Sequence, residues 1–373
     1  MNKKQWLGLN IVLILFVVFL VSCSKQKTEW AGSIEEVDGI VVVKNPIEPI
    51  YSEEAFSLQE ELVIGEAEGK EEYIFQSIYA LDVREIGDIY VLDIKAQHIL
   101  VFTPEGKYLR TIGRPGQGPG ELFVPRSVDY TSFDEVVVGT ANNISYFSPE
   151  GEYLQSIPLT KVPRGTSIKI DSYGNIFGFS SFRDLGVYEL RKYDQEFNEL
   201  FSFESSPHPS EELQRTGKID PFFNVLKWDI INGNQILCGY PEEGYILKIY
   251  DPSANLIRKI EKEYVQREIT EKDLEEEKTK LPPELRENVT APKFFPPYRD
   301  LRSDDEGRIY VYTYGRAPDS EKYYYDIFDA EGRYILKVPL MTRFWILKNK
   351  LYSIEEDEEG YQYIKRYQII WGI

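Results

Sequence analysis

One short sequence pattern recurs along this chain and limits its fold more than any other feature. In each copy an aromatic residue is followed seven positions later by Leu or Ile, and three positions after that by another apolar residue. Turn-forming residues such as Pro-Glu-Gly lie between them in most copies. Each copy therefore predicts a β-hairpin whose apolar positions face one core. The aromatic residues of the five copies are Phe102, Phe147, Tyr193, Tyr250 and Phe328.

A second element precedes each hairpin. It is an Asp- or Gly-rich turn followed by a short apolar strand, as in GDIYVLD (87–93) and GRIYVY (307–312). The first three hairpins begin 45 and 46 residues apart. Four short strands in about 45 residues are typical of one blade of a β-propeller. Helical repeats would show a sustained 3.6-residue periodicity, which the sequence lacks, so an all-β fold is predicted.

The sixth and last unit is incomplete. It begins near Thr342 and ends after its third strand, around Ile370. A propeller that is not closed leaves strand edges exposed, so a fourth strand must come from elsewhere. The apolar segment 39–44 (GIVVVK) is expected to supply it. We predict a single six-bladed β-propeller over residues 39–373, in which an N-terminal strand closes the last blade.

The first complete unit carries a family resemblance. Its sequence, GDIYVLD followed by HILVFTPEGKYLRTIGRPGQGPGELFVP, is similar to an NHL-type repeat, and the loop 113–122 is the most specific part. Over residues 39–373 the chain resembles the six-bladed β-propeller lipoproteins common in Bacteroidetes. The four glycines of the loop suggest a phosphate-binding P-loop, but the Lys-Ser/Thr pair and the following helix of that motif are absent. The loop is therefore interpreted as a connection between blades.

The first 22 residues have the pattern of a bacterial targeting segment. Lys3 and Lys4 precede an apolar run at 11–21, which is shorter than the roughly 20 residues of a membrane-spanning helix. The run ends in Leu-Val-Ser-Cys, which resembles the lipobox of bacterial lipoproteins. We expect residues 1–22 to be a signal peptide, Cys23 to carry a lipid, and residues 23–38 to form a tether. The alternative is a plain signal peptide or an uncleaved anchor.

The tether also indicates a location. Lys25 stands where enterobacterial lipoproteins retained at the inner membrane carry Asp. No acidic cluster follows Cys23, whereas the surface-export signal of Bacteroidetes lipoproteins has one. We expect a protein of the bacterial cell envelope, anchored by its lipid in the outer membrane and facing the periplasm.

Charge and composition argue against several classes of function. The chain has 43 Lys and Arg against 62 Asp and Glu, a net charge of −19, whereas nucleic-acid binding needs a basic face. Two Cys and two His are too few for a zinc site built from those residues or for a disulfide framework. The sequence shows no Ser-His-Asp arrangement, G-x-S-x-G motif or D-x-D-x-D-G calcium loop. We therefore expect no cofactor, identify no catalytic residue, and leave open a calcium site made of scattered carboxylates.

Four arginines recur where the chain enters predicted inner strands. The inner strands of a propeller line its central channel, so guanidinium groups at their entrances would ring one mouth of that channel. Such a ring can bind a carboxylate or phosphate through paired hydrogen bonds. The alternative is that each arginine pairs with an acid of its own blade. The four are Arg126, Arg164, Arg299 and Arg343.

The segment 265–297 interrupts the pattern between blades four and five. Thr270-Glu271-Lys272-Asp273 predicts a capped helix start, and two prolines at 282–283 end the helix. An aromatic and proline cluster follows at 294–298. This insert either forms a lid over the channel mouth, with Phe294, Phe295 and Tyr298 facing a ligand, or is a solvated helix whose aromatic residues pack on the edge of a blade.

These observations leave three hypotheses of different class. The leading one is a lipid-anchored binding or scaffold module that holds a peptide, a glycan or an envelope protein at the channel mouth. The second is a propeller enzyme of the lactonase or lyase type, with a metal held by carboxylates in the channel. The third is a subunit of a larger envelope complex, with the acidic, Tyr-rich surface as its interface.

Overall fold

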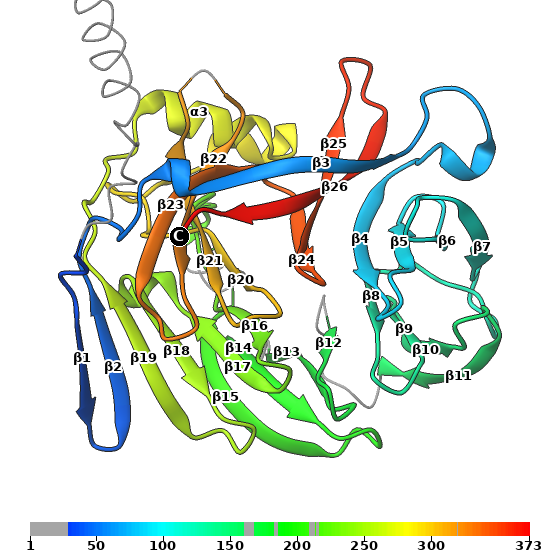
Figure 1. Cartoon of the computed structure of the whole chain (residues 1–373), viewed down its shortest axis with the longest axis horizontal. Helices are drawn as coiled ribbons and strands as arrows, with labels where there is room; N and C mark the ends of the chain where they lie inside the picture. The colour runs from blue at the N-terminus through cyan, green and yellow to red at the C-terminus, as the bar shows by residue number, and fades with distance from the viewer. Residues whose placement is uncertain (1–28, 160–167, 183–185, 209–212, 214–215, 319) are drawn as a thin grey trace, which may run out of the picture.

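The computed structural model describes residues 29–159, 168–182, 186–208, 213, 216–318 and 320–373. Its sheets form six blades around a common centre, as predicted (Figure 1). From the centre outward, the first three blades consist of β4 (Ile78–Val83), β5 (Ile89–Asp93), β6 (His98–Phe102) and β7 (Tyr108–Ile112); β8 (Ser127–Tyr130), β9 (Val136–Gly139), β10 (Asn143–Phe147) and β11 (Tyr153–Pro158); and β12 (Ile168–Ile170), β13 (Ile176–Phe182), β14 (Val187–Tyr193) and β15 (Glu199–Pro207).

Blades four to six include three strands from the N-terminal part of the chain. In order from the centre, these blades consist of β16 (Lys227–Ile231), β17 (Gln235–Gly239), β18 (Ile246–Tyr250), β19 (Leu256–Lys262), β2 (Ile40–Asn45) and β1 (Ser33–Val37); β20 (Asp300–Ser303), β21 (Ile309–Arg316), β22 (Tyr323–Phe328) and β23 (Tyr334–Leu340); and β24 (Phe344–Leu347), β25 (Lys350–Glu356), β26 (Gln362–Trp371) and β3 (Phe56–Ile64). Short 3-10 turns lie at η1 (Glu53–Ala55), η2 (Glu71–Tyr73), η5 (Pro241–Glu243) and η6 (Pro283–Asn288).

The recurring pattern forms the hairpin between the third and fourth strands of blades one to five. The strand register shifts next to the aromatic residue in every copy. The aromatic side chain is buried in each blade. The turn of the first copy contains Gly106 at φ +79, a conformation that favours glycine.

The residue seven positions after the aromatic does not always face the core. Leu109, Leu154 and Leu200 are exposed, because they lie on the outermost strands of blades one to three. In blade four, Ile257 packs against the core between blades four and five, where β2 covers β19. In blade five, Ile335 is buried, because the N-terminal segment runs along β23.

The turns between strands share a local hydrogen-bond pattern. An Asp side chain accepts hydrogen bonds from the backbone N–H groups two and four residues later, as Asp304 does from Glu306 at 3.0 Å and Arg308 at 2.9 Å. Short polar side chains that satisfy nearby backbone donors favour turns over strands. The residues that make this pattern are Asp171, Asp194, Asp251, Asp304, Asp329 and Asp357.

An N-terminal strand closes the last blade, but the predicted strand was wrong. The closing strand is β3, which pairs antiparallel with β26 from Phe56 opposite Trp371 to Ile64 opposite Ile364. Segment 39–44 lies in β2, which pairs in parallel with β19 of blade four. The apolar character of β2 reflects the burial of Val42 and Val43. β3 is the outermost strand of its blade and mostly exposed, and polar residues separate its apolar ones, so it lacks the continuous apolar run of β2.

Between β2 and β3 the chain runs along blade five. Ile50 and Tyr51 donate backbone hydrogen bonds to carbonyls of β23, at 3.2 and 2.9 Å. The N-terminal segment therefore covers the outer edges of blades four, five and six in succession (Figure 1). These contacts tie together the two ends of a chain that would otherwise leave three edges open.

The hydrophobic core is divided between neighbouring blades. Each of six clusters of buried side chains joins residues of two consecutive blades, including one cluster between blades six and one. The propeller is thus held by packing between the faces of its sheets, and the centre is left to the inner strands.

The insert between blades four and five contains α3 (Glu271–Thr279). Thr270 and Asp273 form a capping box at its start. Two ion pairs attach the helix to blade five, Arg299 with Glu277 at 3.1 Å and Arg316 with Glu276. Across the described residues, no helix is both long and apolar enough to span a bilayer.

Candidate functional site: the central cavity

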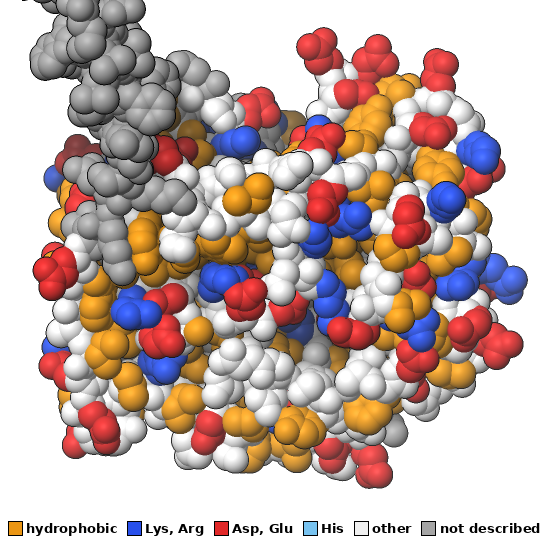
Figure 2. Space-filling view, in the orientation of Figure 1, with side chains coloured by type: hydrophobic (Ala, Val, Ile, Leu, Met, Phe, Trp, Pro, Cys, Tyr) orange, Lys and Arg blue, Asp and Glu red, His pale blue; other side chains and the backbone are white. Residues whose placement is uncertain are grey.

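A cavity of about 1090 Å³ lies at the centre of the propeller. Its walls include the C-terminal ends of all six inner strands, β4, β8, β12, β16, β20 and β24, and the turns that follow them, together with the first residues of β16 and β20. This size lies at the upper end of typical small-molecule sites. The face of the molecule seen in Figure 2 carries acidic and basic side chains intermingled with apolar ones.

One position recurs in the inner strand of every blade. In five blades it lies opposite the residue eight positions later in the next strand, as Asp82 lies opposite Tyr90 and Asp229 opposite Leu237, and in blade six Trp345 lies opposite the residue seven positions later. We call the six residues at this position the central ring, and all except Asp82 line the cavity. The central ring consists of Asp82, Asp129, Lys169, Asp229, Arg302 and Trp345.

Most polar members of the central ring bind the next blade. Oδ2 of Asp82 accepts a hydrogen bond from the backbone N–H of Tyr130 at 2.5 Å. Oδ2 of Asp229 accepts one from the backbone N–H of Ser303 at 2.7 Å. The ammonium group of Lys169 donates to Asp229.

The fifth blade follows the same rule, since the guanidinium of Arg302 donates to the carbonyl of Phe344 in blade six. These contacts join the inner strands of consecutive blades, and they have a structural role.

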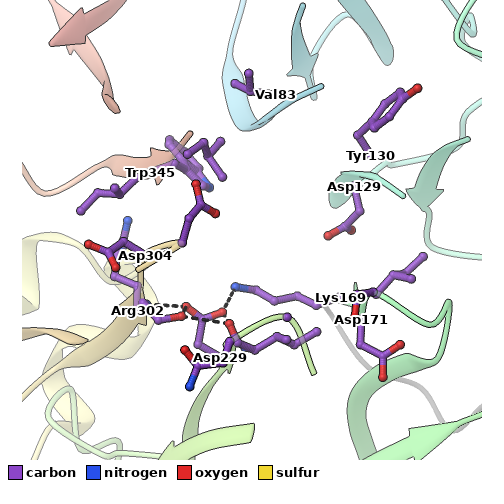
Figure 3. A pocket seen from close by; sticks show the side chains of 18 of the residues that line it. Val83, Asp129, Tyr130, Lys169, Asp171, Asp229, Arg302, Asp304 and Trp345 are labelled. Carbon is purple, nitrogen blue, oxygen red and sulfur yellow. Dashed lines mark hydrogen bonds and ion pairs between the residues drawn. The ribbon is translucent and has the colours of Figure 1, made fainter. Parts of the chain in front are cut away.

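Asp129 departs from this rule. Its Oδ2 is shielded from solvent and has no hydrogen-bond partner among the described residues. Figure 3 shows its carboxylate pointing into the open space between the strands, while Lys169 reaches across to Asp229. Burial and the neighbouring charge of Asp82 raise the pKa of Asp129 to about 8, although Lys169 opposes the shift.

The pKa values of Asp82 and Lys169, two neighbours of Asp129 in the central ring, are shifted as well. Burial raises the pKa of Asp82 to about 6, against the effect of its two backbone donors. For Lys169, burial disfavours the charged form, but the carboxylates of Asp229 and Asp129 outweigh it and raise the pKa. The lysine therefore stays charged and bound to Asp229, while Asp129 is the ring acid that most readily takes up a proton.

Lys227 is a second ionisable group of the cavity wall for which the structure shows no partner among the described residues. It lies at the start of β16. The structure shows no hydrogen bond or ion pair between its side chain and another described residue. Burial lowers the pKa of Lys227, and the charge of Asp300 only partly opposes this. The cavity thus holds one acid and one base that the fold does not use.

The predicted arginines lie elsewhere. Arg126, Arg299 and Arg343 directly precede β8, β20 and β24, and none of the three lines the cavity. Arg164 is outside the described residues. Arg299 pairs with Glu277 at 3.1 Å, and Arg343 donates to the carbonyl of Ile78 in blade one. The structure shows no ion pair between Arg126 and a described residue.

The aromatic residues of the insert are mostly inside the protein. Phe295 packs with Phe222 and Tyr314 in a small separate core. Tyr298 is fully buried in the core between blades four and five, and its hydroxyl donates to the carbonyl of Ile246 at 3.2 Å. Phe294 is half-buried beside Lys293. Cys23 is outside the described residues.

The sequence analysis missed the central ring, although a signal for it was present. Five of the six inner strands are short apolar stretches with a charged residue near the turn that follows, as in ALDV, SVDY and WDII, while blade six has Trp345 at this position. Aligning the six units on their turns would have superposed these residues. Within the described ranges, no group of three or more His, Cys, Asp and Glu side chains is placed to hold a metal ion.

Comparisons with known proteins agree with this architecture. Residues 64–217 match the family DUF5128, which is described as a 6-bladed β-propeller. No curated protein matches the sequence. A Bacteroides fragilis protein described as a candidate exported protein has a TM-score of 0.57 at 11% identity, over 88% of this chain and 99% of that one.

Two further solved structures are similar to this chain at low identity. A member of the DUF4221 family from Bacteroides vulgatus has a TM-score of 0.50 at 14% identity, over 84% and 98% of the two chains. A gluconolactonase from Xanthomonas campestris has a TM-score of 0.46 at 8% identity, over 79% and 88%, which is too remote to bear on activity. The protein is a six-bladed β-propeller, and its residues 64–217 match a family of that description.

Proposed function

We propose that this protein is a binding module whose central cavity takes a small polar ligand. The observation that carries the proposal is that the cavity wall holds two ionisable side chains, Asp129 and Lys227, for which the structure shows no hydrogen bond or ion pair to another described residue. Buried or half-buried charges are costly without partners. A ligand that supplies those partners recovers part of this cost, so its binding is favoured.

The test compares thermal stabilisation by a panel of small polar molecules of both charges in matched variants. Lys227→Met keeps most of the side-chain volume and removes the charge in the cavity, and Lys107→Met makes the same change in an exposed turn. A compound that binds in the cavity raises the melting temperature of the wild type and of Lys107→Met, and raises it less in Lys227→Met or Asp129→Asn. Equal stabilisation of all four proteins by every active compound would exclude the cavity as the site.

The location of the module is a second part of the proposal. The basic start, the apolar run of residues 11–21 and the Leu-Val-Ser-Cys sequence support lipid attachment at Cys23. The lipid holds the propeller at the outer membrane on its periplasmic side. No observation favours the metal-dependent enzyme over this binding role.

Metabolic labelling of cells with a fatty acid tests the anchor. Label is expected in the wild type and in Cys238→Ala, since Cys238 is fully buried in β17, and is expected to be lost in Cys23→Ala. Fractionation of the membranes then reports the location. Equal labelling of the Cys23→Ala protein would contradict lipid attachment at that residue.

A further inference from the structure

We infer that Asp129 forms an acidic subsite for a positively charged amino group, so that the cavity takes an amine-bearing ligand. This inference rests on the proposed binding function and specifies its ligand class. The inference rests on three aspartates that occupy the same position in their inner strands. Two of them hydrogen-bond to the backbone of the next blade, and the third does not.

Two of the three aspartates bind the next blade. The carboxylates of Asp82 and Asp229 each accept a backbone N–H of the next blade, from Tyr130 and Ser303. Asp129 occupies the same position in blade two, yet its Oδ2 makes no such bond. Its carboxylate is directed into the cavity (Figure 3). The fold therefore leaves one acceptor of the central ring available to a donor from outside.

The charged residues around Asp129 determine whether a positive or a negative ligand group is favoured beside it. Asp82 of blade one and Asp229 of blade four both disfavour its ionised form, and only Lys169 of blade three favours it. Lys169 is already bound to Asp229. A ligand anion beside Asp129 would disfavour the ionised form of Asp129 further, as the charges of Asp82 and Asp229 already do, whereas an ammonium group would favour that ionised form. An ammonium group also supplies the hydrogen-bond donor that Oδ2 lacks.

The same arrangement predicts that a proton is released on binding. With a pKa of about 8, Asp129 is mostly protonated at pH 7, and an ammonium group binds well only to the ionised form. Binding then moves the proton from Asp129 to the solvent. Affinity is expected to rise with pH, by about eightfold between pH 7 and 8.5, as the ionised fraction grows from roughly a tenth to about three quarters.

The probe for this inference is 1,4-diaminobutane, with 1,4-butanediol as its neutral counterpart of similar length. The diamine keeps its charge over this pH range, because alkyl amines titrate near pH 10. Calorimetric titration of the wild type at pH 7 and 8.5, in two buffers of different ionisation heat, gives both the affinity and the number of protons released. We expect binding of the diamine alone, with proton release at pH 7.

Two matched variants identify the subsite. Asp129→Asn is expected to weaken diamine binding at least tenfold and to abolish its pH dependence. Asp38→Asn makes the same change in the exposed turn between β1 and β2, away from the cavity, and is expected to keep both. Melting curves show whether each variant is folded.

Four results would overturn the inference: no diamine binding by the wild type, equal binding of the diol, equal weakening by both variants, or unchanged affinity in Asp129→Asn. A ligand from the panel that depends on Lys227 but not on Asp129 would leave the proposed function standing and remove only the amine subsite. The two proposals can therefore fail separately.

Discussion

The backbone N–H of Tyr334 donates a hydrogen bond of 2.7 Å to Oδ1 of Asn45, which lies 289 positions earlier in the chain. Nδ2 of Asn45 donates to the carbonyls of Gly332 at 2.9 Å and of Glu261 at 3.2 Å. The Asn45 side chain is almost completely buried. One amide group therefore joins the end of β2 to both blade four and blade five.

Replacing this amide should destabilise the whole propeller. Asn45→Ala leaves the N–H of Tyr334 and two carbonyls without partners in a buried place, so we expect the free energy of unfolding to fall by about 2–3 kcal/mol. Urea denaturation measures the loss. Asn198→Ala, in an exposed turn, is the control and should cost less than about 1 kcal/mol. Similar losses for both variants would contradict the joining role of Asn45.

Truncation distinguishes the two N-terminal strands. A protein that begins after Asn45 lacks β1 and β2 but keeps β3, so we expect it to fold with a lowered melting temperature. A protein that begins after Ile64 also lacks the closing strand, which leaves β26 unpaired and blade six with an open edge. We expect this second protein to lose cooperative unfolding by circular dichroism. The opposite order of stability would mean that β3 is not what closes the propeller.

The ionisation of Asp129 should make stability depend on pH. Its pKa is about 8 in the folded protein and about 3.9 in an unfolded chain, so the folded state binds more protons between these values. Through this group, stability falls as pH rises from about 4 to 8. Asp129→Asn removes the loss, and we expect it to match the wild type near pH 4 and to be more stable near pH 8.5 by about 1–3 kcal/mol.

Melting curves across this pH range provide the measurement. Asp194→Asn is the control, because the amide of Asn198 lowers the pKa of Asp194. That variant should gain no stability at high pH. An Asp129→Asn protein with an unchanged pH profile would show that Asp129 is not the group responsible.

Arg299 is expected to contribute to stability. Its guanidinium lies 4.2 Å from the ring centre of Tyr314 and pairs with Glu277 of α3. Arg299→Ala should lower the free energy of unfolding by about 1–2 kcal/mol, measured by urea denaturation. Arg126→Ala is the matched control, for which a change within about 0.5 kcal/mol is expected. An unchanged stability of Arg299→Ala would favour a ligand-binding role for this residue.

The strand that closes the propeller could be predicted only in part from the sequence. The need for an N-terminal strand followed from an incomplete sixth unit, and this was correct. Segment 39–44 was expected to be that strand because of its apolar character, which reflects burial. The closing strand is mostly exposed, so hydrophobicity pointed to a strand that packs on blade four instead.

The candidate site, too, could be predicted only in part from the sequence. The charged residues of the inner strands can be found in the sequence, and their shared register follows from the turns. Whether Asp129 binds a neighbouring N–H, as Asp82 does, depends on how two blades meet. The angle between two neighbouring blades is set by side-chain packing between their sheets. The unpaired carboxylate of Asp129 could therefore not be identified from the sequence.

The sequence by itself determined the hairpins, the number of blades and the turns, because these depend on contacts between residues close together in the chain. Aromatic spacing, Asp side chains that bind their own turns and short apolar strands are all local features. The tertiary structure alone decided which strand closes the ring, which charges pair across blades and which are left facing the cavity. These outcomes depend on contacts between residues up to 289 positions apart, for which no local pattern carries a signal.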